Sequence, residues 1–120
     1  MPTLQIFTNV PKASLPDGFV AKCSDIWMEL IGKPKKFILV HVLPDQMMSF
    51  AGTQEPCAFV NCISIGKIGK EENKCYTEKI TELLGSIGVA KDRMYVSFSD
   101  VARQDVGYDG TTFAFWSPSK

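Results

Sequence analysis

The sequence predicts an α+β fold of repeated βαβ units, with one four-stranded mixed sheet and two antiparallel helices on one face. Three observations predict it. Leu4 and Ile6 give an apolar alternation at the start of the chain, as in a half-buried strand. Two later stretches, within 19–31 and 76–87, space apolar residues three and four apart, which is typical of amphipathic helices. A β-rich stretch follows each helix, so the order strand, helix, strand occurs twice, and right-handed crossovers put both helices on one face.

In the first unit, residues 8–11 form a turn after the strand, and the polar and proline residues of 14–18 open the first helix. Gly32 and Pro34 end that helix. Residues Phe37 to Leu43 are β-rich and apolar on both sides, which predicts a strand with no solvent-exposed side. The apolar face of the helix consists of Phe19, Cys23, Ile26, Trp27, Leu30 and Ile31.

The second unit repeats this plan. Ala58 to Ile65 predicts a strand, residues 66–69 a turn, and Met94 to Ser99 the last strand. The helix between them ends at Gly88. Because two helices cover only one face of a sheet whose strands are apolar on both sides, we expect a homo-oligomer whose sheets face one another. The apolar face of this helix consists of Tyr76, Ile80, Leu83, Leu84 and Ile87.

The chain has 120 residues and a mass of 13.3 kDa, which suits one domain, residues 1–120, with a sizeable core. Thirteen basic residues balance thirteen acidic ones, so nothing favours nucleic acid or an anionic membrane as a partner. The N-terminus lacks the apolar region of a secretion signal, and the apolar runs are too short to span a bilayer. We expect synthesis in the cytosol and no membrane insertion. The four cysteines lie in helical and strand patterns, so we expect reduced thiols.

Several common functional motifs are absent from the sequence. A single histidine, His41, excludes a histidine-rich metal site, and its apolar strand favours a core or interface position over a catalytic role. The glycines and lysines of 66–70 lack the spacer and the Ser or Thr of a P-loop. No Gly-x-Ser-x-Gly elbow occurs. We therefore expect neither a metal nor a cofactor.

The chain begins with Met1 and Pro2. Methionine before a small residue such as proline is normally removed, which leaves the secondary amine of Pro2 at the start of a strand. An α-amino group titrates at about 7.7 to 8.0, and burial among apolar neighbours disfavours its charged form. A buried terminal proline is therefore a candidate general base. Met1 and Pro2 taken alone are more typical of a frayed chain end than of a catalytic site. The rest of the chain reverses this preference and favours Pro2 as a base.

Sequence motifs from nearly the whole chain support Pro2 as a base. They are Met1-Pro2, Thr8 to Pro11, Leu15 to Phe19, Gly32 to Pro34, Val40 to Val42, Pro44 to Gln46, Glu55 to Ala58, Ser64 to Gly69, Asp92-Arg93, Tyr95, Val106-Gly107 and Thr111 to Phe113. With these motifs the chain resembles the macrophage migration inhibitory factor family of the tautomerase superfamily, more closely than it resembles D-dopachrome tautomerase. The resemblance implies a homotrimer in which the sheets surround a central channel.

The resemblance also implies roles for individual residues. Pro2 is expected to be the catalytic base, and Lys33 to hold the substrate's carboxylate or the developing enolate oxygen. If the resemblance is set aside, Lys33 is better explained as a lysine at a helix C-terminus, where the helix dipole favours a positive charge. Ser64 and Ile65 are expected to line the pocket, and Tyr95 of the adjacent subunit to form an aromatic wall near Pro2.

Tyr108 and Phe113 are expected to complete the apolar rim of the pocket. The chain departs from the mammalian members at several positions. Ser97 stands in place of an asparagine, so a hydrogen bond to the substrate is lengthened or lost, and Phe37 stands in place of a tyrosine, which removes a hydroxyl from the rim. The Cys-x-x-Cys motif is incomplete, so thiol oxidoreductase activity is not expected. Residues 114–120 extend past the usual end of the family, and their packing beside the pocket or against a neighbour is left open.

The resemblance implies a cofactor-independent keto–enol tautomerase for phenylpyruvate or a dopachrome-like compound, together with a cytokine-like role. The alternative is a receptor-binding cytokine homologue whose pocket is vestigial. A hydratase or decarboxylase, as found elsewhere in the superfamily, needs additional arginines near Pro2, and the chain has only Arg93 and Arg103. The expected partners are further copies of the chain, a small aromatic keto acid and a cell-surface receptor. The expected location is the cytoplasm, with secretion by a route that needs no leader.

Overall fold

The computed structural model describes residues 1–118. In this part of the chain, short 3-10 helices join the larger elements and a small hairpin follows the main sheet. The elements are, in chain order, β1 (Thr3–Thr8), η1 (Lys12–Ser14), α1 (Phe19–Ile31), η2 (Lys35–Phe37), β2 (Leu39–Leu43), β3 (Ala58–Ser64), α2 (Lys70–Gly85), β4 (Met94–Asp100), η3 (Arg103–Asp105), β5 (Gly107–Tyr108) and β6 (Thr111–Thr112).

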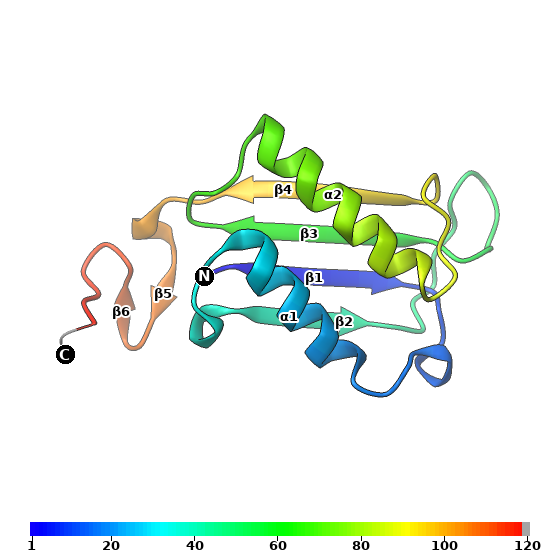
Figure 1. Cartoon of the computed structure of the whole chain (residues 1–120), viewed down its shortest axis with the longest axis horizontal. Helices are drawn as coiled ribbons and strands as arrows, with labels where there is room; N and C mark the ends of the chain where they lie inside the picture. The colour runs from blue at the N-terminus through cyan, green and yellow to red at the C-terminus, as the bar shows by residue number, and fades with distance from the viewer. Residues whose placement is uncertain (119–120) are drawn as a thin grey trace.

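The four longer strands form one mixed sheet in the order β2-β1-β3-β4. β1 pairs in parallel with β2, and β3 pairs in parallel with β4, while β1 and β3 are antiparallel. Both helices lie on the same face of this sheet and run in opposite directions (Figure 1). The predicted fold, two βαβ units with both helices on one face, is confirmed.

The core lies between the helices and the sheet, because the strands alternate and the helices are amphipathic. Leu4 and Ile6 of β1 and Val60 of β3 point toward the helices and are buried. Trp27 of α1 is fully buried and meets Tyr76 of α2 edge to face, with 5.4 Å between the ring centroids. This contact joins the interiors of the two helices over the sheet.

Glycines at both ends of α1 account for its predicted bounds. Gly18 and Gly32 have φ angles of 74° and 68°, in the left-handed region where other side chains are strained. The Gly32 amide donates to the Met28 carbonyl at 2.9 Å and ends the helix. The next residue, Lys33, leaves the helix toward the loop after β3, where its Nζ donates to the Ile65 carbonyl.

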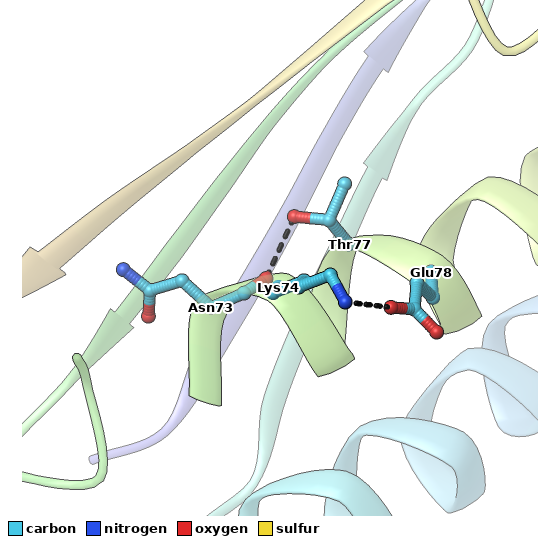
Figure 2. Close-up of polar contacts among 4 residues, drawn as sticks. All are labelled: Asn73, Lys74, Thr77 and Glu78. Atoms are coloured by element: carbon cyan, nitrogen blue, oxygen red, sulfur yellow. Dashed lines mark hydrogen bonds and ion pairs between the residues drawn. The ribbon is translucent and has the colours of Figure 1, made fainter. Parts of the chain in front are cut away.

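The outer surface of α2 is polar (Figure 2). Lys74 and Glu78 form an ion pair of 3.7 Å across one turn, and the Thr77 hydroxyl donates to the Asn73 carbonyl at 2.8 Å. Exposed pairs of this kind contribute only about 0.3–0.5 kcal/mol. The apolar face of α2, rather than these contacts, therefore holds the helix on the sheet.

Two predicted boundaries were wrong. The second helix ends at Gly85 and not at Gly88, and Ile87 packs on the core from the turn that follows. Phe37 lies in η2 and not in a strand, because a tight turn follows Pro34, with the Phe37 amide donating to the Pro34 carbonyl at 3.0 Å. The Phe37 ring is thereby directed to the end of the sheet.

The face of the sheet away from the helices carries rows of side chains that cross all four strands. The rows are Leu43, Phe7, Phe59 and Tyr95; His41, Gln5, Asn61 and Ser97; and Leu39, Thr3, Ile63 and Ser99. In the middle row, the Gln5 amide nitrogen lies 3.2 Å from His41 Nδ1, and Asn61 donates to Gln5 Oε1 at 3.2 Å. His41 is exposed in the single chain, so a core position is excluded, and an interface position stays a prediction.

β5 and β6 form an antiparallel hairpin beyond the main sheet, on the side where the N-terminus lies (Figure 1). The sequence analysis predicted no element here, because each strand has only two residues and shows no apolar alternation. The connecting turn uses Asp109 and Gly110 with φ angles of 52° and 83°. The hairpin places the residues that follow it close to the start of β1.

Candidate active site

Pro2 lies at the N-terminal end of β1, an inner strand of the sheet. Its carbonyl accepts a hydrogen bond from the Leu39 amide at 2.9 Å, and its side chain is fully buried. Extending the β1–β3 pairing by one residue puts Ser64 opposite Pro2. Ser64 is 0% exposed, and its hydroxyl has no hydrogen-bond partner among residues 1–118. The start of β1 is therefore held in place rather than frayed.

The terminal amine of the whole chain belongs to Met1, which is partly buried above Pro2. Burial, and in second place the positive charge of Lys33, lower the pKa of this amine from 8.0 to about 6. Both causes act against a positive charge at this position. A terminal amine held here is mostly neutral at pH 7 and able to accept a proton.

Lys33 supplies a cation next to this amine. Burial lowers the pKa of Lys33, and the nearby charges of Lys67 and Arg103 lower it further, while Asp100 acts in the opposite direction. The Nζ group has three donors, of which one is bonded to the Ile65 carbonyl. Lys33 therefore retains donors for an oxygen atom of a bound molecule.

Arg103, in η3, lines the same cavity as Met1 and Lys33. It is exposed, and it makes no hydrogen bond or ion pair with any residue of the described chain. From the sequence, Arg103 was considered only as one of two arginines, too few for the hydratase or decarboxylase alternative. Its presence at the pocket follows from the turn after β4 and carried no local sequence signal.

An aromatic cluster forms the other side of the pocket. The rings of Tyr108 and Phe113 stack with 5.2 Å between centroids, and Trp116 meets Phe37 edge to face at 5.5 Å. The Trp116 indole N–H donates to Asp109 Oδ2 at 3.3 Å. Trp116 thus packs beside the pocket, which answers the question that the sequence left open for this part of the tail. The cluster consists of Phe37, Tyr108, Phe113 and Trp116.

Two cavities lie between the cationic and aromatic groups, and Met1, Phe37 and Phe113 line both. The first, of about 210 Å³, is also lined by Lys33, Ile65, Arg103 and Trp116. The second, of about 300 Å³, is also lined by Thr3, Leu39 and Tyr108. Together they fall within the size of small-molecule sites, roughly 300–1,000 Å³. The first cavity combines Lys33 and Arg103 with aromatic rings, and the second is mainly apolar and aromatic but also includes Lys36.

A larger groove, of about 540 Å³, lies between α1 and α2 and includes Cys75 in its lining. Every charged residue that lines it is exposed. Acid–base sites favour partly buried titratable groups whose surroundings shift their pKa values. The pocket at the start of β1 has such groups, so we place the candidate site there.

Tyr95 and Ser97 do not lie at this pocket within one chain. The strand register aligns Tyr95 with Phe7, two strands away. Tyr95 is therefore about 17 Å from Pro2 along the strands, at roughly 3.3 Å per residue. Its ring packs on Phe50 with 5.1 Å between centroids, and the residue is 68% exposed. The expected wall from the Tyr95 of an adjacent subunit stays a prediction.

Residues 1–118 give little support for disulfide or metal chemistry or for a membrane-spanning helix. All four cysteines have free thiols, as predicted, and three of them are buried. No group of three or more His, Cys, Asp or Glu side chains in this part of the chain is placed to hold a metal ion. No helix formed by these residues combines the length and apolarity that crossing a bilayer needs.

The geometry defines a class of protein: an α+β domain with a pocket of cationic and aromatic residues where the inner strand β1 begins. A sequence profile described as macrophage migration inhibitory factor matches residues 1–114, and the chain belongs to that family. The resemblance seen in the sequence motifs is confirmed. Trp116 lies beyond the matched segment.

Individual relatives agree with this assignment. The macrophage migration inhibitory factor of Rattus norvegicus is 42% identical over 115 residues, which cover 95% of this chain and 100% of the relative. A solved structure of the factor from Trichinella spiralis has a TM-score of 0.90 at 34% identity, covering 93% of this chain and 100% of the other. The homologue from Prochlorococcus marinus has a TM-score of 0.87 at 28% identity, covering 93% and 99% of the two chains.

Proposed function

We propose that the protein is a keto–enol tautomerase that needs no cofactor and acts on small aromatic keto acids of the phenylpyruvate type or on dopachrome-like compounds. The observation that carries the proposal is the buried start of β1, where surrounding atoms lower the pKa of the terminal amine to about 6. Removal of Met1 would make the nitrogen of Pro2 the terminal amine, at a residue that is more deeply buried than Met1. A neutral amine is the form that a general base requires.

The reaction moves one proton and one pair of electrons, and nothing leaves the substrate. The Pro2 nitrogen takes a proton from the carbon next to the carbonyl, and the C–H electron pair forms a carbon–carbon double bond. The carbonyl electrons move to oxygen, where the Lys33 ammonium stabilises the negative charge. Pro2 then returns the proton to that oxygen. The aromatic cluster holds the ring of the substrate through its faces and edges.

The proposal includes a homotrimer. Within one chain, Leu39 and Tyr95 on the open face of the sheet are 58% and 68% exposed, and burial of such a face favours association with further copies. In the trimer, Tyr95 and Ser97 would reach the pocket of the adjacent subunit, which Ile65 lines. Ser64 was expected to line it as well, but within one chain it is fully buried and lines neither cavity. Activity would then depend on assembly. Light scattering after size exclusion tests this, and a stable monomer at micromolar concentration contradicts it.

The test of the catalytic proposal is Pro2→Gly. We expect the rate of phenylpyruvate tautomerisation to fall by at least about 100-fold, within the range for loss of a general base, while the oligomer stays intact. The matched control is Pro118→Gly, at an exposed position near the end of the described chain. Unchanged turnover in Pro2→Gly contradicts the role of Pro2. Intact-mass measurement accompanies the assay, since retained Met1 would leave the Pro2 nitrogen in an amide without basicity.

The relatives support a second role. The rat protein that is 42% identical to this chain is a macrophage migration inhibitory factor, and we propose that this protein also acts as a secreted, cytokine-like signal that binds a cell-surface receptor. Receptor binding that survives Pro2→Gly would make signalling independent of catalysis. Receptor binding lost together with turnover, in a trimer that is still assembled, would tie the two roles to one site.

A further inference from the structure

Arg103 is the feature of the pocket that the proposed function does not yet use. It lies in η3, immediately after the sheet, and lines the cavity that contains Met1, Lys33 and Trp116. Its guanidinium group makes no hydrogen bond or ion pair with any residue between 1 and 118. An arginine side chain offers five donors in a planar fork that fits a carboxylate.

The charges around Arg103 favour an anion in the pocket. Lys33 lines the same cavity, and the charges of Lys67 and Arg103 both lower the pKa of Lys33. The nearby carboxylate of Asp100 is engaged, because its Oδ1 accepts the Gly66 amide at 2.9 Å. The formal net charge of the whole chain is zero, so this local excess of positive charge is a property of the site. A bound anion would relieve the repulsion among these cations.

We propose that Arg103 binds the carboxylate of the substrate, so that Lys33 is left to hold the carbonyl oxygen that becomes the enolate. The inference rests on the proposed function and deepens it by assigning the substrate's carboxylate to Arg103, a residue of η3. A 2-keto acid carries its carboxylate and its carbonyl on neighbouring carbons, and two separate cations in one cavity match these two groups. The aromatic ring of the substrate then faces Phe37 and Trp116.

The assignment separates binding from catalysis. Arg103 interacts with a group whose charge does not change during the reaction, so it contributes to binding of substrate and transition state alike. Lys33 interacts with an oxygen that becomes negative only as the proton is removed, so it contributes to the chemical step. Replacing Arg103 is therefore expected mainly to raise KM, and replacing Lys33 mainly to lower kcat.

The experiment compares phenylpyruvate with its methyl ester, which keeps the ring and the carbonyl but has no carboxylate. In Arg103→Gln we expect the KM for phenylpyruvate to rise about 10- to 100-fold, the range for a charge-assisted hydrogen-bonded pair, with kcat changed less than about 3-fold. The KM for the ester is expected to change less than about 2-fold. Arg103→Lys is expected to restore part of the affinity for the acid. The control is Lys91→Gln, which removes one exposed positive charge outside the pocket.

Two results overturn the assignment: an unchanged KM for phenylpyruvate in Arg103→Gln, or equal increases for the acid and the ester. If the unmodified protein has no turnover, the proposed tautomerase function fails, and calorimetric Kd values for phenylpyruvate still test Arg103. A Kd raised at least about 10-fold by Arg103→Gln and not by Lys91→Gln supports the binding of the carboxylate by Arg103. Equal Kd values in both variants refute it.

Discussion

The two ends of the sheet use a cation in different ways. Lys33 and Arg93 each lie between the helix and the second strand of a βαβ unit. Arg93 donates to the carbonyls of Pro56 at 2.9 Å and Phe50 at 3.1 Å, and it is 5.6 Å from the Phe50 ring. It also donates to the carbonyls of Thr53 and Glu55. Lys33 has one bond, to the Ile65 carbonyl, and cationic neighbours.

The difference distinguishes a structural cation from a functional one. The guanidinium of Arg93 is occupied by backbone carbonyls and fixes the loop at residues 50–56 on the end of the sheet. Lys33 keeps free donors inside a cavity, and burial lowers its pKa. The two βαβ units share one topology, so the difference between Lys33 and Arg93 arises from the segments that pack on each end of the sheet. A bound molecule has room at the end that contains Pro2.

The strongest test of this contrast replaces both cations by methionine. We expect Lys33→Met to lower the kcat for phenylpyruvate by about 100-fold or more, because a donor to the developing enolate oxygen is lost. Arg93→Met is expected to lower the free energy of unfolding by about 2–3 kcal/mol, because several carbonyls lose a charged donor. Tautomerase assays and chemical denaturation measure the two effects. Equal losses of stability in both variants would remove the distinction.

A second prediction concerns the aromatic side of the pocket. Trp116 packs on the cluster and lines the cavity, whereas Phe115 is 78% exposed. Trp116→Ala is expected to raise the KM for phenylpyruvate about 3- to 10-fold, the equivalent of one aromatic contact, with little change for an aliphatic 2-keto acid. Phe115→Ala is the matched control from the same segment. A parallel rise in both variants would mean that the tail acts by general destabilisation.

The smallest expected effect is a shift in pH dependence. Burial, followed by the charge of Lys33, holds the pKa of the terminal amine at about 6. Lys33→Met removes the second cause, so the protonated amine becomes less unfavourable and its pKa rises while burial still keeps it below 8.0. In the protein without Met1 we expect the Pro2 amine to respond to Lys33→Met in the same direction, and NMR titration of the Pro2 ring protons measures that response. A pKa that falls, or a similar rise in Lys91→Met, would contradict the electrostatic explanation.

Much of the fold was predictable because the signals are local. The helix from Phe19 to Ile31 follows from three- and four-residue spacing between glycines. The first strand follows from alternation, and the second from a β-rich, apolar run. Phe37 was misplaced because its β-forming neighbours suggested a strand, while the turn after Pro34 took it into η2. Pro2 and Lys33 were found through motifs of the family. Arg103 and Trp116 carry no motif: the turn after β4 places Arg103, and Trp116 follows the hairpin.

The sequence alone determined the two βαβ units, the family and the candidate base, because periodicity, helix-ending glycines and short motifs are readable along the chain. The tertiary structure decided which cations share the cavity, since Lys33 and Arg103 come from two segments that meet only through the strand order. It also decided that Trp116 faces the pocket while Phe115 faces solvent. Convergence of this kind depends on the packing of distant segments, and no local pattern encodes it.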